Sequence, residues 1–130
     1  MPTAQHPLRR QFLVYSLEVA GIPFYIGIGR AERAFDRERY VRYLMQREER
    51  GKSVKWCFSN RVIAAFFRRG CKMEVCKVCP GLTRPQALAA ERETIAWLVS
   101  NGFTLANRQH NPRCPAKPET VVRAVLVDRP

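Results

Sequence analysis

The chain has 130 residues, the usual size of a single domain and enough to bury a hydrophobic core without disulfide or metal cross-links. Hydrophobic residues make up 46% of the chain, which excludes a disordered protein, and no stretch reaches the ~18 uninterrupted apolar residues of a membrane span. The 23 Lys and Arg against 11 Asp and Glu give a net charge of +12, which predicts a polyanionic partner. Charge alone is compatible with a nucleic-acid enzyme and with a ribosomal-type or chromatin-type structural protein.

The first predicted elements form a β-hairpin. Residues 1–10 contain prolines and no periodicity, so an irregular segment is expected there. Residues 12–19 and 24–28 are strand-type runs on either side of Ala20-Gly21, a turn signal. Tyr15 lies on the first strand and Tyr25 on the second. They share a face if the connecting loop has an odd number of residues, as a loop over residues 20–22 would.

Two helices are predicted next. Residues 31–49 carry apolar side chains at helical spacing, namely Ala34, Phe35, Val41, Leu44 and Met45, and Gly51 ends this helix. A second, short helix follows Ser59, a good N-cap, and stops at Gly70. Its buried side is expected to hold Val62, Ile63, Phe66 and Phe67.

The third predicted strand covers residues 71–79, and a third helix follows it. Thr83 and Gln86 form a capping-box pattern with Pro85 in the first turn, which predicts a helix over residues 84–100. Residues 103–106 are strand-like, and residues 120–127 are apolar enough to be either an added strand or a docking helix. The prediction is one α+β domain over residues 1–130, with a three-stranded mixed or antiparallel sheet flanked by helices and an irregular basic extension at 108–130.

One carboxylate falls on the apolar side of the third predicted helix. Leu88, Ile95 and Leu98 form a stripe at spacings of three and four, and Glu91 lies on that stripe. Because an unpaired buried carboxylate is costly, Glu91 is expected to have a compensating partner. That partner is either a structural salt bridge to an arginine or a bound cation.

The two hairpin tyrosines are candidates for proton chemistry. If Tyr15 and Tyr25 share a face, both phenols stand at the start of a basic helix, where neighbouring cations would favour the phenolate. A phenol needs such help to act as a base near neutrality. The alternative is that both are packing residues, the commoner role of strand tyrosines.

Arginines supply the candidate phosphate contacts. Arg33 and Arg37 are four residues apart on the first predicted helix and Tyr40 lies one turn further on, so they form a ridge that could face phosphate. Spacing singles out Arg33 as the site residue of the ridge. The candidates for further nucleic-acid contacts are Arg30, Arg37, Arg61 and Arg108, against the alternative of solvated surface.

The five cysteines, in a chain without an export signal, predict reduced thiols and a cytoplasmic protein. Cys76 and Cys79 could form a zinc site with His110 and Cys114. Alternation along a strand would send Cys76 and Cys79 to opposite faces, so buried apolar thiols are the preferred interpretation over structural zinc.

Taken together, the motifs resemble the ordered signature of the GIY-YIG nuclease family. They are Val14-Tyr15-Ser16-Leu17, the run Phe24-Tyr25-Ile26-Gly27-Ile28-Gly29, Arg33 eight residues after Tyr25, Ala87-Leu88-Ala89-Ala90-Glu91 with Ile95, and Leu105-Ala106-Asn107. The match spans about residues 12–107 and is most similar to the bacterial and phage branch, akin to the nuclease domain of ankyrin- and LEM-domain endonucleases.

The resemblance implies one-metal, in-line hydrolysis of a phosphodiester bond. By similarity to the family, Tyr15 helps to activate water, Tyr25 and Arg33 steady the attacked phosphate, and Glu91 holds one Mg²⁺ or Mn²⁺ at the leaving oxygen. Gly27, Arg37, Tyr40 and Asn107 are expected to support this site, Asn107 by hydrogen bonding.

Two positions depart from the family pattern. Ile28 stands where many relatives have lysine, and Arg37 where they have histidine or tyrosine. An arginine cannot accept a proton, although it could lower the pKa of Tyr15 or grip phosphate, and Tyr40 is a candidate substitute base. A catalytically weak or inactive nucleic-acid-binding module or accessory subunit is therefore the alternative to an active enzyme.

The sequence thus predicts a divalent-metal-dependent endonuclease acting on duplex or branched DNA in preference to RNA. Its expected setting is cytoplasmic and bacterial or phage-derived, in repair, restriction or mobile-element biology, with no membrane partner. Because the catalytic module takes up most of the chain, specificity is expected from DNA shape or from a partner protein.

Overall fold

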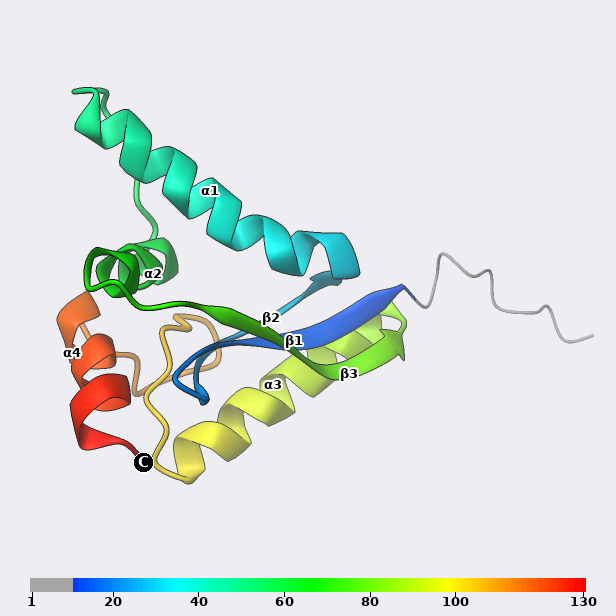
Figure 1. Ribbon diagram of the computed structural model, residues 1–130. Coiled ribbons are helices and arrows are strands. Elements are labelled where there is room, and N and C mark those ends of the chain that lie inside the picture. The colour runs from blue at the N-terminus through cyan, green and yellow to red at the C-terminus, as the bar shows by residue number, and fades with distance from the viewer. Residues whose placement is uncertain (1–10) are drawn as a thin grey trace, which may run out of the picture.

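The computed structural model describes residues 11–130, so the irregular segment predicted at 1–10 lies outside the described residues. Over these residues the protein is α+β, with a three-stranded antiparallel sheet and four α-helices (Figure 1). The elements in chain order are β1 (Phe12–Val19), β2 (Ile22–Arg30), α1 (Ala31–Glu49), α2 (Phe58–Arg68), β3 (Glu74–Leu82), α3 (Arg84–Ser100), α4 (Pro118–Arg123) and the π-helical turn η2 (Ala124–Asp128).

Helices cover both faces of the sheet (Figure 1). The strand order is β2-β1-β3 with β1 in the centre, and both pairings are antiparallel. Helices α1 and α2 lie on one face, α3 lies on the other, and α4 packs against α2. The predicted α+β class, hairpin and three-stranded sheet are confirmed, although β2 extends beyond residues 24–28 and β3 is displaced toward the C-terminus from residues 71–79.

The β1–β2 hairpin differs from the prediction in its turn. Ala20-Gly21 alone forms the turn, with φ angles of 53° and 78°, the two positive values that match the twist of paired strands. The register then shifts beside Leu17, which pairs with Tyr25 and leaves Phe24 as an extra residue. This β-bulge, and not a loop with an odd number of residues, puts Tyr15 and Tyr25 on the same face.

Helix α1 has the predicted bounds, but one of its predicted core positions is wrong. The Phe35 side chain is 56% exposed, because the buried side of the helix is set by Ala34, Val41 and Leu44. Phe35 lies one residue outside that stripe, where a helix turns its side chains to solvent.

Helix α2 begins earlier than predicted. Cys57 is its N-cap residue, so Ser59 lies in the first turn and does not cap the helix. The Ser59 hydroxyl accepts a hydrogen bond from Arg37 instead. The predicted buried side of α2, with Val62, Ile63, Phe66 and Phe67, is confirmed.

Helix α3 runs between the predicted residues because its capping box forms. The Gln86 backbone N–H donates to Thr83 Oγ1 at 3.3 Å, and the Thr83 backbone N–H donates to Gln86 Oε1 at 3.0 Å. Leu88 is 40% exposed, so its predicted place on the apolar stripe is wrong. The neighbouring Ala87 is fully buried there instead.

A second bulge changes the faces of the cysteines on β3. Ser16 pairs with Cys76 and Val14 pairs with Cys79, so Val78 is an extra residue. Opposed residues of paired strands share a face, so Cys76 and Cys79 lie on the same side of the sheet. The prediction that alternation separates these two thiols is wrong for that reason.

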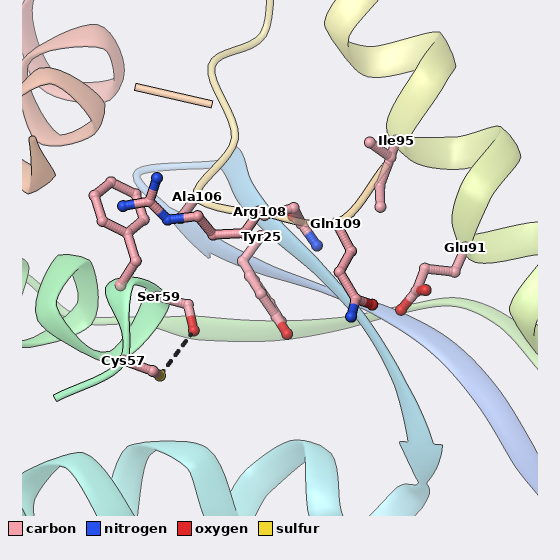
Figure 2. A pocket seen from close by; sticks show the side chains of 10 residues that line it. Tyr25, Cys57, Ser59, Glu91, Ile95, Ala106, Arg108 and Gln109 are labelled. Atoms are coloured by element: carbon pink, nitrogen blue, oxygen red, sulfur yellow. Dashed lines mark hydrogen bonds between the residues drawn. The ribbon is translucent and has the colours of Figure 1, made fainter. Parts of the chain in front are cut away.

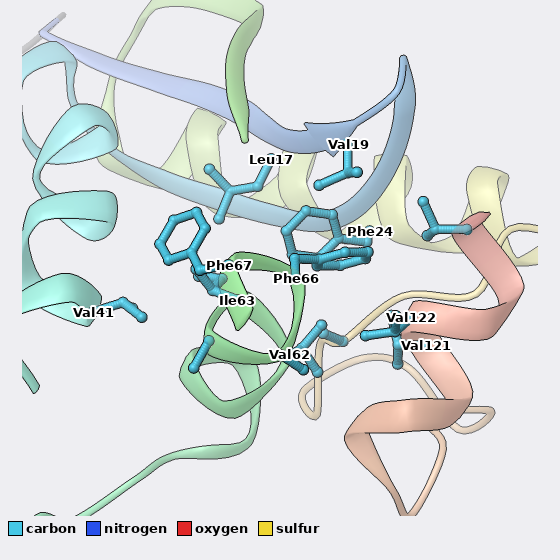
Figure 3. Packing of buried hydrophobic residues seen from close by; sticks show 14 of the residues in the cluster. Leu17, Val19, Phe24, Val41, Val62, Ile63, Phe66, Phe67, Val121 and Val122 are labelled. Atoms are coloured by element: carbon cyan, nitrogen blue, oxygen red, sulfur yellow. The ribbon is translucent and has the colours of Figure 1, made fainter. Parts of the chain in front are cut away.

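The core has one apolar cluster on each face of the sheet. Figure 3 shows the larger cluster, in which side chains from β1 and β2 meet those of α1, α2 and α4. Its centre holds Phe24 and Phe66, whose ring centroids are 4.8 Å apart. The smaller cluster lies between the sheet and α3 and contains Val14, Ile26, Ile95, Leu98 and Leu105.

The C-terminal region is more ordered than predicted. Residues 120–127 are helical, and Val121, Val122 and Val125 are at most 1% exposed in the larger cluster. The expectation of an irregular extension over 108–130 is therefore wrong for α4 and η2, because three valines at helical spacing pack into the larger cluster. Residues 103–106 are not a strand, although Ala106 N–H donates to Phe24 C=O.

Within residues 11–130, none of the helices combines the length and the apolar character needed to cross a bilayer.

Candidate active site

A hollow of about 230 Å³ opens beside the edge strand β2, where α2 begins and α3 passes. Figure 2 shows Tyr25 and Glu91 entering it from opposite sides, with Gln109 between them. The residues that line the hollow are Tyr25, Cys57, Phe58, Ser59, Glu91, Ile95, Ala106, Asn107, Arg108 and Gln109. Four separate parts of the chain, namely β2, the start of α2, α3 and the segment after α3, thus contribute polar side chains to one place.

Tyr15 reaches toward this hollow because Gly27 has no side chain. Tyr15 pairs directly with Gly27 across the β1–β2 ladder, and its ring occupies the space that a Cβ at position 27 would need. The Tyr15 side chain is only 4% exposed. Glycine is therefore required at position 27 for a steric reason, and the phenol crosses β2 toward the edge of the sheet.

Arg37 connects α1, α2 and β2 at the site. Its Nη1 donates to Ser59 Oγ and to Asn60 Oδ1, both at 3.0 Å, and its Nη2 donates to Tyr25 Oη at 3.0 Å. The guanidinium carbon also lies 4.7 Å from the centre of the Tyr25 ring. The fork geometry of arginine makes these contacts simultaneously, so the Tyr25 phenol is fixed in position.

The electrostatics at Tyr15 oppose the predicted phenolate. Burial raises the pKa of the Tyr15 phenol above its ordinary value, and the positive charge of Arg37 offsets only part of that effect. The nearby Tyr25 and Glu91 raise this pKa further. Tyr15 is therefore a protonated phenol at neutral pH, and the expectation that neighbouring cations favour its phenolate is wrong because desolvation outweighs them.

Glu91 lies on the inner side of α3. It is one helical turn from Ala87 and from Ile95, both fully buried, and is itself half-buried. No salt bridge to Glu91 exists in the part of the chain that the structure describes. Burial raises the pKa of its carboxyl, and the charges of His110 and Arg92 offset this in part. The structural salt bridge weighed as an alternative is therefore not formed.

Asn107 joins the segment after α3 to the edge of the sheet. Its Oδ1 accepts from Ile26 N–H at 2.9 Å, and its Nδ2 donates to Ile26 C=O at 2.7 Å. The amide thus takes the place of a neighbouring strand, which satisfies both backbone groups of a fully buried edge residue. Next along the chain, the Arg108 guanidinium stacks on Phe58 at 4.1 Å from the ring centre.

Not all of the predicted site residues come together. Tyr25, Glu91, Asn107 and Arg108 line the hollow. Arg37 is connected to it by its hydrogen bond to Tyr25, and Tyr15, which fills the space beside Gly27, lies near Arg37, Tyr25 and Glu91. Arg33 is exposed and lines a different hollow, together with Arg30 and Arg84.

The two remaining candidates lie elsewhere. Tyr40 is 51% exposed and stacks on Tyr43 with ring centroids 6.5 Å apart. Arg61 lines a third hollow with Trp56 and Arg68. Neither contributes to the lining of the hollow around Tyr25.

The four residues weighed for zinc do not form a cluster. Among residues 11–130, no three His, Cys, Asp or Glu side chains meet in a way that could hold a metal ion. Cys79 packs against the smaller apolar cluster, and the pKa of the Cys76 thiol is raised by burial and by the neighbouring Glu18.

Three polar residues of the site were missed from the sequence. Ser59 and Asn60 hold Arg37, and Gln109 lines the hollow and points toward Glu91. Asn60 could have been noticed, since it falls three residues before Ile63 on the apolar side of a predicted helix. Gln109 gave no signal, because it lies in a segment without periodicity.

The arrangement can bind an anionic oxygen and a hard cation close together. Two phenols and a guanidinium offer hydrogen-bond donors, and an unpaired carboxylate offers oxygen ligands. Comparison with protein-family models, with curated proteins and with solved structures gave no match.

Proposed function

We propose that the protein is a divalent-metal-dependent endonuclease of the GIY-YIG type that hydrolyses phosphodiester bonds in DNA. One observation carries the proposal: the Glu91 carboxylate, half-buried and without a counter-ion among the described residues, faces the same hollow as Tyr25. Support also comes from the order of the motifs, since Tyr25, Glu91 and Asn107 are distant in sequence and line one hollow, with Tyr15 near Tyr25 and Glu91. A structural protein would have no need of an unpaired inward carboxylate.

The side chains around Glu91 fit a single Mg²⁺ or Mn²⁺. Mg²⁺ in phosphoryl-transfer sites is bound by one or two carboxylates, with waters and substrate phosphate completing its shell. Burial raises the pKa of the Glu91 carboxyl, and no salt bridge among the described residues neutralises its charge. An inward carboxylate that binds a cation shows both features when the cation is not bound. When bound, the cation would stabilise negative charge on the leaving oxygen.

The phenols would act as donors and positioning groups. Tyr15 keeps its proton at neutral pH because burial raises its pKa, so it would orient the attacking water by a hydrogen bond and would not remove a proton in the resting state. Tyr25, held by Arg37, would donate to a non-bridging phosphate oxygen. Arg37 adds a fixed positive charge beside that oxygen.

The partner we propose is nucleic acid, with DNA favoured over RNA. Arg30, Arg33 and Arg84 line a hollow of about 400 Å³ that has no acidic lining residue. Three guanidinium groups around one hollow suit a backbone phosphate beside the cleaved one. Each such contact that is removed should reduce the slope of log affinity against log salt by about 0.9.

A nicking assay tests the enzyme directly. Supercoiled and branched DNA are incubated with Mg²⁺, Mn²⁺ or a chelator, using the wild type, Glu91→Gln and Tyr15→Phe. Glu93→Gln is the matched control, because Glu93 is an exposed carboxylate on the same helix. Cleavage that requires the metal and falls at least about a hundredfold in Glu91→Gln, but not in Glu93→Gln, is the expected result.

One observation favours a second candidate, a binding module or accessory subunit without activity. Arg37 stands where a proton acceptor is expected from the family, and its hydrogen bonds to Ser59, Asn60 and Tyr25 are all internal. An arginine cannot accept a proton. Tight, salt-sensitive DNA binding with no strand breaks on any DNA structure or with either metal would favour this candidate over the endonuclease.

A further inference from the structure

The segment that follows Asn107 is a short loop closed by asparagine side chains. Asn107 fixes its first end to Ile26. Asn111, which is 5% exposed, donates from Nδ2 to Leu105 C=O at 3.1 Å and to Asn107 C=O at 3.0 Å. Two buried amides therefore hold residues 108–110 in place, although this segment has no regular secondary structure.

The loop contains a strained residue. His110 has a φ of 60°, in the left-handed region that costs a residue with a side chain roughly 1–2 kcal/mol. Such a conformation persists only where the surrounding structure over-determines it, and strain of this kind clusters at ligand-binding positions. Directly after it, Asn111 closes the loop onto the Asn107 C=O, and Gln109 directly before it lines the hollow.

The side chain of Gln109 points toward the Glu91 carboxylate across the hollow that both residues line. Figure 2 shows the Gln109 amide and the Glu91 carboxylate pointing toward one another, with the amide oxygen on the carboxylate side. Among residues 11–130, no hydrogen bond joins the two side chains and no salt bridge involves Glu91. Burial raises the pKa of its carboxyl, although the charges of His110 and Arg92 lower this pKa in part. Two oxygen acceptors facing each other repel, unless a cation lies between them.

The geometry points to Gln109 as a second protein ligand of the divalent cation: its amide oxygen and the Glu91 carboxylate bind the ion together. This inference rests on the proposed function, because it assigns a residue to the cation of that same site. Hard cations take amide carbonyl oxygens as ligands alongside carboxylates, and a preformed pair needs less ordering than a single flexible glutamate. The asparagine-closed loop supplies that preorganisation.

The competing role for Gln109 is to donate. If the amide is turned over, its NH₂ group donates to Glu91 and only orients the carboxylate, since the oxygen and nitrogen of an amide are told apart by their hydrogen bonds. The two roles predict opposite effects of removing the side chain. Loss of a ligand weakens cation binding, whereas loss of a competing donor leaves it unchanged or tightens it.

The test measures cation binding without DNA, so it does not depend on cleavage. Mn²⁺ is titrated into the full chain, free Mn²⁺ is followed by electron paramagnetic resonance, and its location is followed by broadening of the amide NMR signals of residues 91 and 107–111. The variants are Gln109→Ala and Glu91→Gln, with Gln46→Ala as the matched control because Gln46 is an exposed glutamine on α1. Gln109→Glu is a second variant at the same position, and circular dichroism checks that each variant folds.

We expect Mn²⁺ to broaden the signals around Glu91, Glu91→Gln to abolish this, and Gln109→Ala to weaken binding about tenfold, with Gln46→Ala unchanged. Gln109→Glu should tighten binding, because it adds a charged ligand. Wild-type affinity in Gln109→Ala, with loss in Glu91→Gln, would overturn the role of Gln109 and leave the proposed nuclease intact. Absence of Mn²⁺ effects near Glu91 in the wild type would overturn both.

Discussion

Replacing Asn107 by alanine should destabilise the protein more than the loss of a few side-chain atoms would suggest. The Asn107 side chain is 6% exposed and makes both of its hydrogen bonds to the backbone of Ile26, which is fully buried. Alanine would leave the N–H and the C=O of Ile26 without partners at the edge of the sheet. Each unsatisfied buried group costs about 1–3 kcal/mol, so the two together cost about 2–6 kcal/mol.

The position of Asn107 favours the lower part of that range. Asn107 lines the open hollow, so water can enter the vacated space and satisfy one of the two Ile26 groups. A loss of about 2–4 kcal/mol in the free energy of unfolding is expected. This is a large share of the ~5–15 kcal/mol by which a domain is stable.

Urea denaturation provides the measurement, with the midpoint expected to fall at an unchanged slope. Asn101→Ala is the control, because Asn101 is exposed and its Nδ2 donates to Trp97 C=O at the end of α3. That variant should change stability by no more than about 1 kcal/mol. If Asn107→Ala were no more destabilised than Asn101→Ala, the claim that this side chain replaces a paired strand would be wrong.

Three further predictions follow from the same structure. Burial raises the pKa of the Glu91 carboxyl, so folding favours its protonated form. The wild type should therefore lose stability relative to Glu91→Gln as pH rises through the pKa of this carboxyl in the folded protein. The stabilities of the two proteins should converge below the pKa that the carboxyl has in the unfolded chain. Urea denaturation across that pH range checks this, and a constant difference would contradict it. Gly27→Ala should lower the free energy of unfolding by about 1–3 kcal/mol, because the new Cβ overlaps the Tyr15 ring. Gly29→Ala is the control, because a Cβ at that position meets Arg33 Cβ at 3.5 Å, an ordinary contact. Equal losses in the two variants would refute the steric argument. Val122→Ala should cost about 2 kcal/mol in thermal or urea unfolding, since Val122 is fully buried between α4 and α2, and a neutral result would show that α4 is not part of the cooperative core.

Several features of the fold were determined by local sequence alone. The bounds of α3 follow from the Thr83–Gln86 capping box, and those of α1 follow from helical periodicity closed by Gly51. The turn at Ala20-Gly21 was equally readable, as was the apolar side of α2. In each case the signal and its effect lie within a few residues, so no knowledge of the rest of the chain is needed.

The candidate site was only partly readable. The inward position of Glu91 could be predicted from spacing, because one helix face sets it, and the importance of Asn107 came from the resemblance. The central position of Arg37 could not be predicted, since it depends on Ser59 and Asn60, which belong to another helix. Arg33, which spacing favoured, lies on a different hollow.

Only the tertiary structure decided the remaining features. The bulges at Phe24 and Val78 arise where strands must match partners that are distant in sequence, and each bulge reverses which face the following side chains occupy. The ionisation of Tyr15 likewise depends on how far the assembled core excludes water, which outweighs the charge of Arg37. Local sequence determines the ends of α1 and α3 and the hairpin turn because their energies are short-ranged, whereas strand register, burial and pKa depend on partners that are brought together only when the whole chain folds.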